Sequence, residues 1–266
     1  ISPAYSLIFL FLKKNGFFDK CTEGNLHFRG YYSYYIEKEY KRNNNVFIMN
    51  SQGVSEDVSV AFSKAVGEIV ERTVSGVGDM NRDIKNLSYR EIEEKKYPVL
   101  YPPKYHRFLD MQKKKYKVLN YDVSKKIDWV LGENLITGED TYIPKQITEW
   151  FKQDFSVDHV FYNSTTNGSA GYFTKEGAVL RGLLEVVQRD AFLVHWLTMI
   201  SPEIIDKRTL PNDLRNRIKD FELFGVTLYV FNTTAVSMPS VVVVVVNESS
   251  DTPQVCLSGG SGVTFR

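Results

Sequence analysis

Two long stretches of the chain carry apolar residues at the spacing of an amphipathic helix. In residues 56–74 the apolar side chains recur every three or four positions, which places them on one helical face. A turn-forming segment, residues 51–55, precedes this stretch and provides a helix start. A second helix is predicted over residues 175–198, after a polar loop at residues 164–171. The chain therefore contains two long helices that each follow a Gly-bearing polar segment.

Shorter patterns predict strands around these helices. Residues 226–231 and the valine run 241–246 are apolar on both faces, which is typical of buried strands. Residues 95–129 are rich in lysine and tyrosine and contain three prolines, so we expect mostly loop there. The other predicted elements are strands at 31–39 and 45–50, a hairpin turn at 134–138 and a helix at 145–155. The mixture indicates an α/β or α+β chain with helices packed on at least one sheet.

The bulk properties fit an ordinary globular protein. The chain has 266 residues, of which 43% are apolar and 24% charged, enough for one large domain or two tightly packed ones. The net charge of +1 gives no field that would favour nucleic acid or an anionic membrane. The apolar run 6–12 is too short to span a bilayer, so we expect a buried helix or strand there. Cys21 and Cys256 lie far apart, which favours a reducing cytoplasm over a disulfide-linked secreted domain.

The most informative feature is a motif that occurs once in each long helix. The first helix contains Glu68-Ile-Val-Glu71-Arg72, and the second contains Glu185-Val-Val-Gln188-Arg189. Residues at i, i+3 and i+4 share one helical face, so each motif presents its polar groups together. Two copies at long separation indicate two pseudo-equivalent halves.

The residue types of this motif suit a metal-bound nucleotide. Mg2+ binds through one or two carboxylates together with phosphate oxygens, and an arginine can bind phosphate through two hydrogen bonds. Backbone N–H groups of the preceding loops could also bind phosphate. The alternative is an ordinary i,i+4 ion pair on a solvated helix face, which is the commoner explanation for one isolated motif. The repetition, and the apolar residues that flank the acids, favour a shared binding role.

These motifs resemble the nucleotide motifs of the YcaO family. The stretch from Gly53 to Ser75 is similar to the first motif, and the stretch from Thr166 to Ala191 is similar to the second. The segments at 128–144 and 225–246 resemble the family's connecting strands, so the likeness covers most of the chain after Gly53. The resemblance implies an α+β fold with mixed or antiparallel sheets packed with helices, in two pseudo-equivalent halves around a nucleotide cleft. It divides residues 1–266 into a lead-in (1–50), a first half (51–130) and a second half (131–266) that ends before the family's third motif.

The resemblance also implies a function and a set of site residues. Family members use ATP and Mg2+ to phosphorylate a peptide backbone amide, most commonly to form azoline rings in ribosomal peptide natural products. By this resemblance the metal ligands are Glu68, Glu71 and Glu185, and the cofactor-binding set adds Arg72, Asn167, Gly168, Gln188 and Arg189. No catalytic residue is assigned. The implied partners are a precursor peptide, with a leader-peptide-binding protein and a homodimer as further possibilities, and neither nucleic acid nor membrane is implied.

The sequence departs from the family pattern at three points. Lys64 stands where the family has Ser four residues before the first Glu, and Gln188 replaces an acid of the second motif. The third motif, a Gln and an Arg on a later helix, would follow Arg266. A non-catalytic scaffold that binds a leader peptide or partner therefore stays open, as does a thioamide- or amidine-forming enzyme.

Other candidate chemistry is weaker. The run Lys113–Lys115 with nearby tyrosines could bind nucleic acid or an acidic peptide, but the neutral net charge favours a solvated loop. His106, His159 and His195 lack metal-ligand spacing. There is no Gly-x-x-x-x-Gly-Lys-Ser/Thr sequence, which argues against a P-loop enzyme.

Overall fold

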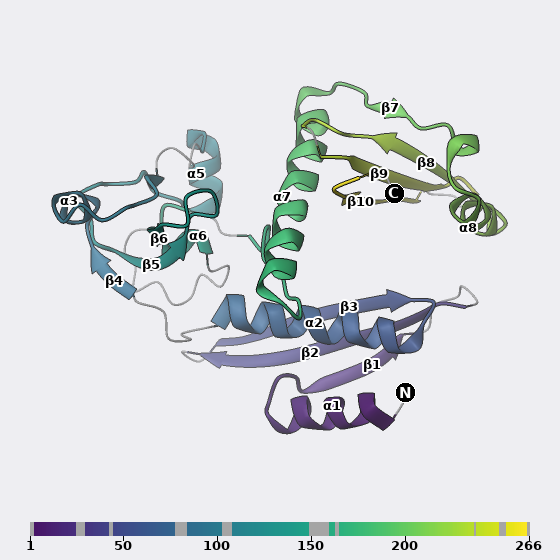
Figure 1. Cartoon of the computed structure of the whole chain (residues 1–266), viewed down its shortest axis with the longest axis horizontal. Coiled ribbons are helices and arrows are strands. Elements are labelled where there is room, and N and C mark those ends of the chain that lie inside the picture. Colours follow the sequence, from purple (N-terminus) through teal and green to yellow (C-terminus); the bar gives the residue numbers. More distant parts are fainter. Residues whose placement is uncertain are drawn as a thin grey trace. The chain divides into compact units, whose positions relative to one another are not determined.

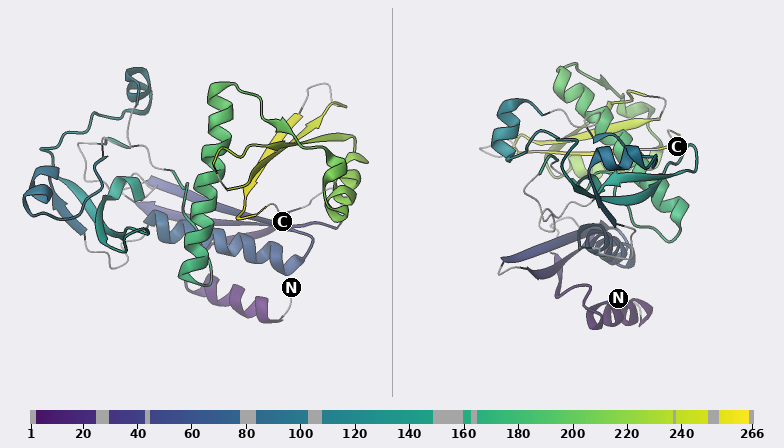
Figure 2. Two further views of the ribbon diagram at one scale, coloured as in Figure 1. Left: turned by 45° about the horizontal axis from the view of Figure 1, so that its top comes forward. Right: turned by 90° about the vertical axis from the view of Figure 1, so that its left-hand side faces the viewer.

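The computed structural model of the chain divides into two compact units, Ile1–Thr166 and Asn167–Arg266. It describes residues 3–24, 30–42, 45–77, 84–102, 108–148, 160–162, 165–236, 238–249 and 254–264. Both units combine antiparallel sheets with helices (Figures 1 and 2), which confirms the predicted α+β class. His106 and His159, and most of the helix predicted at 145–155, lie outside the described residues.

The first unit begins with a three-stranded antiparallel sheet covered by a long helix. Strands β1 (Lys20–Gly24), β2 (Tyr32–Arg42) and β3 (Asn45–Ser55) pair in sequence order, and α2 (Val58–Val77) packs along β2 and β3 (Figure 1). The predicted apolar face of α2 forms the core, because Ala61, Ala65 and Ile69 are fully buried. Asp57 begins the helix by accepting hydrogen bonds from the N–H groups of Ser59 and Val60 at 2.8 and 2.9 Å.

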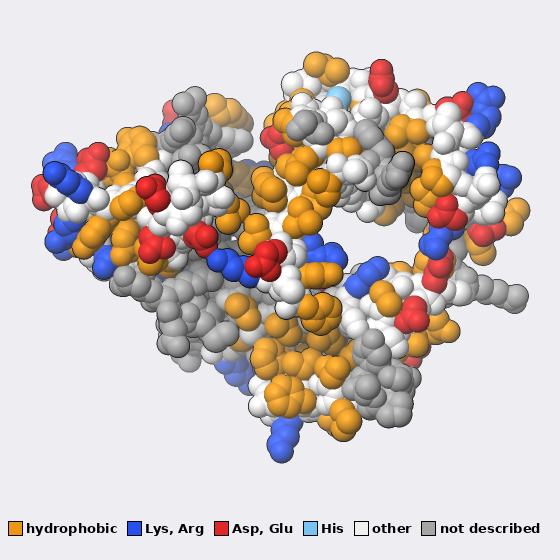
Figure 3. All heavy atoms as spheres, in the orientation of Figure 1, with side chains coloured by type: hydrophobic (Ala, Val, Ile, Leu, Met, Phe, Trp, Pro, Cys, Tyr) orange, Lys and Arg blue, Asp and Glu red, His pale blue; other side chains and the backbone are white. Residues whose placement is uncertain are grey.

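Helix α1 (Pro3–Lys14) is only partly packed, contrary to the prediction of a buried element. Phe9 and Leu12 contact the core that the first sheet forms with α2. Leu7, Leu10 and Phe11 remain 59–69% exposed. The region of α1 shows apolar surface at the lower edge of Figure 3. The apolar run is continuous, so it surrounds the helix, whereas a helix lying on a core buries one face only.

A second antiparallel sheet completes the first unit. It has the order β4 (Ile84–Leu87), β5 (Ile127–Glu133), β6 (Asp140–Pro144), and its core is centred on the fully buried Trp129. The predicted hairpin turn connects β5 to β6, with Gly138 at φ +72°. Within the described part of this region, the sheet is accompanied by the short helices α3 (Tyr89–Glu94), α5 (Asp110–Tyr116) and α6 (Lys145–Thr148). Helix α5 lies in the stretch for which we expected mostly loop, and it carries the Lys113–Lys115 run.

The second unit is a four-stranded antiparallel sheet with helices packed against it. Helix α7 (Lys175–Thr198) has the predicted bounds. Thr174 caps its first turn, and Met199 ends it in the left-handed conformation. The sheet has the order β10 (Gln254–Ser261), β9 (Ser240–Asn247), β8 (Val226–Asn232), β7 (Glu203–Ile204). Helix α7 contacts β9 and β10, and α8 (Asn212–Glu222) contacts β8 (Figure 1); the short 3-10 helix η2 (Lys207–Thr209) precedes α8.

The valine strand β9 is less buried than its sequence predicted. Of its residues only Ser240 and Val242 are buried, and the others are half-buried. The apolar pattern therefore located the strand correctly but overestimated its cover within this unit. Among the described helices, none combines the length and apolar character needed to cross a membrane.

Candidate functional site

In the first unit, the motif on α2 is held against the end of strand β3. The Glu68 carboxylate accepts a hydrogen bond from the Gln52 N–H at 2.9 Å through Oε2. Its other oxygen, Oε1, accepts one from Arg72 at 2.6 Å. The same arginine donates to the carbonyl oxygen of Asn50 at 2.7 Å, so Arg72 joins helix and strand as well as neutralising Glu68. Both side chains are about one-third exposed, at 33% for Glu68 and 28% for Arg72.

The second unit repeats this arrangement on α7. Glu185 Oε2 accepts a hydrogen bond from the N–H of Gly168 at 3.1 Å, in the loop before the helix. Glu185 Oε1 lies 3.6 Å from Arg189, its i+4 neighbour, and the Glu185 side chain is 30% exposed. In both units one carboxylate therefore binds a backbone N–H of the preceding segment and pairs with an arginine one turn later. We call this arrangement the carboxylate clamp, formed by Glu68 and Arg72 in one unit and Glu185 and Arg189 in the other.

The two clamps differ in how firmly the arginine is held. Arg72 makes short hydrogen bonds to Glu68 and to Asn50, and its side chain is 28% exposed. Arg189 is 57% exposed and makes a longer ion pair. An exposed arginine with a long ion pair can turn toward a ligand at low cost, whereas Arg72 would first have to give up its hydrogen bonds.

Glycines allow the close packing of both clamps. A Cβ at Gly53 would overlap the backbone of α2 at Ala61, so only glycine lets β3 approach the helix this closely. Gly168 has φ +86°, a conformation that side-chain-bearing residues rarely adopt, and an added Cβ there would lie 3.0 Å from Val186. Of the predicted loop residues Asn167 and Gly168, which precede α7, Gly168 packs against the helix.

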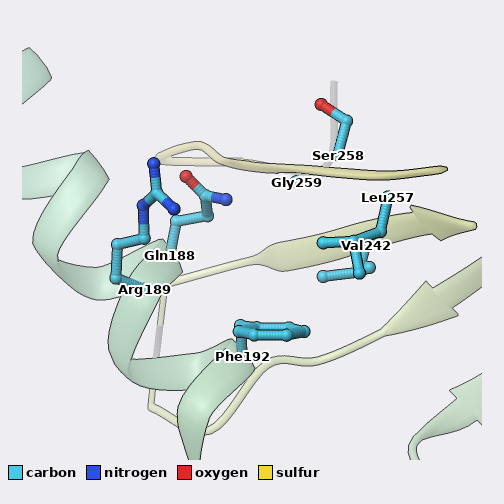
Figure 4. A pocket seen from close by; sticks show the side chains of 7 residues that line it. All are labelled: Gln188, Arg189, Phe192, Val242, Leu257, Ser258 and Gly259. Atoms are coloured by element: carbon cyan, nitrogen blue, oxygen red, sulfur yellow. The ribbon is translucent and has the colours of Figure 1, made fainter. Parts of the chain in front are cut away.

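The second motif also lines a small pocket between α7 and the sheet. The pocket has a volume of about 210 Å3, and Figure 4 shows Gln188 and Arg189 extending from α7 toward β10. The Phe192 ring, one turn further along α7, lies beneath them. The remaining lining residues are Val242, Leu257, Ser258 and Gly259.

The predicted metal ligands are divided between the two units, and neither unit holds all three of them. Glu68 and Glu71 belong to the first unit and Glu185 to the second. Among the described residues of each unit, no three acidic, His or Cys side chains form a ready-made metal cluster. Glu71 is half-buried, and its carbonyl oxygen accepts a hydrogen bond from Ser75 at 2.7 Å.

Sequence reasoning missed the residues that support the motifs from a distance. Ser51 is buried and donates to the carbonyl oxygen of Ala65 at 2.7 Å, which ties β3 to α2 one turn from Glu68. Gly259 is far from α7 in the sequence, and its backbone contacts the Gln188 side chain. The only local signal was the glycine-rich composition of residues 258–262.

Comparisons with known proteins identify the family and the fold. A family model described as YcaO cyclodehydratase, ATP- and Mg2+-binding, matches residues 50–266. A search of curated proteins finds no match. Several solved structures have a similar fold.

One of these structures is a heterocyclase in complex with substrate and cofactor, with a TM-score of 0.77 and 18% identity over 93% of this chain and 35% of that chain. A second is YcaO from Methanopyrus kandleri bound with AMPPCP and Mg2+, with a TM-score of 0.66 and 18% identity over 99% and 62%. A third is the E. coli microcin synthetase McbBCD complex, with a TM-score of 0.63 and 15% identity over 90% and 58%. The chain thus spans less than two thirds of each of these proteins.

The family model covers more than half of the chain and includes both clamps. The similar structures carry the same α+β fold. The chain belongs to the YcaO family.

Proposed function

We propose that the protein is an ATP- and Mg2+-dependent YcaO enzyme that phosphorylates a peptide backbone amide to form azoline rings. The family is described as an ATP- and Mg2+-binding cyclodehydratase. Among proteins of similar fold, one is a heterocyclase with substrate and cofactor and another is bound with AMPPCP and Mg2+. These descriptions support the proposal for this chain.

The observation that carries the proposal is the duplicated carboxylate clamp. Isolated i,i+4 ion pairs are common on solvated helices and stabilise them by only about 0.3–0.5 kcal/mol. Here the same carboxylate also accepts a backbone N–H in each unit, at 2.9 Å for Glu68 and 3.1 Å for Glu185. Two such arrangements on helices far apart in the sequence are better explained by two halves of one binding site than by surface pairing.

The clamps leave capacity for a metal-bound nucleotide. A carboxylate oxygen can accept two hydrogen bonds or metal contacts, and one interaction is described for each oxygen of Glu68 and Glu185. Hard, partly exposed carboxylates are the ligands that Mg2+ prefers. In this proposal Glu68, Glu71 and Glu185 hold Mg2+.

The other site residues would serve the phosphates. Arg189, more exposed than Arg72, would bind a phosphate oxygen, while Arg72 holds Glu68 in place. Asn167 and Gly168 would shape the loop beside it, because this loop packs directly on α7. Gln188 would line the same site without supplying negative charge.

When bound, Mg·ATP supplies the phosphoryl group and neutralises its charge. The protein's own task is to align the substrate amide oxygen with that group and to exclude water. A Cys, Ser or Thr side chain of the substrate attacks the preceding carbonyl carbon and loses its proton, and the amide oxygen takes the phosphoryl group from ATP. Phosphate then leaves with that oxygen while the amide nitrogen loses its proton and forms a C=N bond, so the products are ADP, phosphate and a peptide that has lost the elements of one water.

The proposal includes a precursor peptide as substrate and a leader-peptide-binding protein as a partner. The E. coli microcin synthetase, of similar fold, forms a complex with pro-MccB17. A homodimer and a cytoplasmic location also belong to the proposal. Cys21 and Cys256 are free thiols, which suits a reducing compartment.

The test is to incubate the complete protein with a Cys-, Ser- and Thr-rich precursor peptide, ATP and Mg2+. We expect phosphate release that depends on the peptide, together with loss of water from the peptide mass. Replacement of the amide oxygen by sulfur would instead identify a thioamide-forming enzyme, and its replacement by an amine nitrogen would identify an amidine-forming one. A protein that binds peptide but releases no phosphate would contradict the enzyme proposal.

One observation favours a second candidate, a non-catalytic scaffold that binds a leader peptide or partner. Gln188 stands where the family carries an acid, and its amide lies on Gly259. An amide gives Mg2+ only a dipole, so this change weakens one side of the metal site. Peptide binding without any affinity for Mg·ATP would support the scaffold.

A further inference from the structure

The pocket beside Arg189 depends on a contact between a helix side chain and a strand backbone. Strand β10 runs antiparallel to β9, with Gly259 opposite Val242. Because side chains alternate along a strand, Leu257 and Gly259 face the same side, and both line the pocket with α7. Figure 4 shows the Ser258 side chain directed away from α7.

Gln188 occupies the space that a side chain at position 259 would need. An added Cβ at Gly259 would overlap Nε2 of Gln188 and come within 3.3 Å of its Cδ. The Nε2 end of the glutamine amide therefore lies close to the backbone of β10 at Gly259. Gly260, the next residue, has nothing within 4 Å of an added Cβ. Neither glycine has a positive φ. What distinguishes Gly259 is the overlap with Gln188, together with a closer-than-usual approach of an added Cβ to the Val241 carbonyl oxygen at 3.2 Å.

We propose that Gln188 is a positioning residue, whose contact with Gly259 sets the spacing of α7 and β10 and holds the Arg189 guanidinium over the pocket. Arg189 follows Gln188 directly on α7, and both line the pocket. If Gln188 were displaced it would move into the volume beside Arg189, because β10 blocks the opposite direction. Gln188 thus positions Arg189 through its contact with β10, and the absence of a side chain at Gly259 makes that contact possible.

The expected effect on nucleotide affinity rests on the proposed function. The contact between Gln188 and Gly259 rests on geometry alone. Gly259→Ala displaces Gln188 without removing it. The overlapping atom is the end of a flexible side chain, so we expect the variant to fold. Gly260→Ala adds the same methyl group one residue further along, into open space, and is the matched control.

The first measurement is calorimetric binding of Mg·ATP to the complete protein. We expect Gly259→Ala to raise the Kd roughly 3- to 10-fold, the effect of losing one well-placed polar contact. Gly260→Ala should leave the Kd and the melting temperature unchanged. Gln188→Ala should weaken binding by a similar factor. The double variant Gln188→Ala/Gly259→Ala should bind no more weakly than Gln188→Ala alone, because the two changes disrupt one contact.

The second measurement is independent of ATP. The side-chain amide resonance of Gln188, identified by its loss in Gln188→Ala, should shift in Gly259→Ala and stay in place in Gly260→Ala. If Gly259→Ala does not fold, the contact predicts that the double variant regains folding.

The inference is overturned if both alanine variants bind Mg·ATP as the wild type does, if both weaken binding equally, or if the double variant shows additive losses. An unmoved Gln188 resonance, or a double variant that remains unfolded, would also overturn it. If the wild type does not bind Mg·ATP, the proposed function fails. The resonance then decides whether the contact exists.

Discussion

Replacing Glu68 or Glu185 by glutamine removes the same charge from two equivalent positions but breaks hydrogen bonds of unequal quality. The Glu68 carboxylate accepts bonds of 2.9 and 2.6 Å, whereas Glu185 makes contacts of 3.1 and 3.6 Å. Glutamine must turn its NH2 group toward one of the two donors, so at least one bond is lost in each variant.

The expected losses of stability follow from these distances. A hydrogen bond to a charged group contributes about 1.5–3 kcal/mol, and a one-third exposed side chain recovers part of this from water, so Glu68→Gln should cost about 1–2 kcal/mol. Glu185→Gln should cost about 0.5 kcal/mol, because its partner Arg189 is 57% exposed. For a protein of this size each kcal/mol lowers the melting temperature by roughly 2–4 °C.

Binding of Mg·ATP should respond differently from stability. If both carboxylates are ligands of one metal, each variant removes one negative ligand, and both should lose affinity by a similar factor of at least about ten. Scanning calorimetry and titration calorimetry on the same two variants provide the test. Affinity losses that follow the stability losses, large for Glu68→Gln and small for Glu185→Gln, would refute the shared role and leave Glu68 as a structural residue.

Three further variants test separate parts of the structure. Gly53→Ala should destabilise the protein by about 3 kcal/mol in urea denaturation, because the added Cβ overlaps the α2 backbone. Gly67→Ala, which has open space around the added Cβ, should be neutral or stabilising. Equal effects of the two substitutions would contradict the close packing of β3 on α2. Ser88→Ala should cost about 1 kcal/mol by removing the α3 cap. Ser88 and Lys126 lower the pKa of Glu91 to about 2. The ionised Glu91 carboxylate therefore stabilises the folded protein fully above its ordinary pKa of 4.5, and this stabilisation is lost as the pH falls toward 2. Thermal melts across this pH range should show a weaker pH dependence of the melting temperature in Ser88→Ala than in the wild type, and an unchanged pH dependence would refute the cap. Gln188→Ala should weaken Mg·ATP binding less than Glu68→Ala, and equal losses would make the amide as strong a ligand as the acid.

The long helices were predictable because their signals are local. Apolar spacing located α2 and α7, and for α7 the capping residue Thr174 and the left-handed Met199 mark its observed ends. Helix α5 was missed because no residue of it is buried, so it has no apolar stripe to detect. Burial was harder to predict than structure type. The apolar run in α1 and the valines of β9 both suggested full burial, but cover depends on what the rest of the fold places over them.

The duplicated motif could be found in the sequence, but the contacts that support it could not. Recurrence of the motif indicated Glu68 and Glu185 correctly as equivalent positions, and the structure confirms that they make equivalent local contacts. The difference between Arg72 and Arg189 could not be read from the sequence, because it depends on the Asn50 carbonyl and on solvent exposure. The contact of Gln188 with Gly259 joins segments far apart in the chain. The spacing of apolar residues along the sequence does not reveal contacts of this kind.

The central claim is that the two carboxylate clamps form one Mg·ATP site. The most direct measurement is an experimental structure of the complete protein with Mg2+ and a non-hydrolysable ATP analogue. We predict that carboxylate oxygens of Glu68 and Glu185 both bind Mg2+ at the same nucleotide, at about 2.0–2.1 Å. A structure in which the two carboxylates lie on opposite surfaces, or in which neither contacts the metal, would contradict the account.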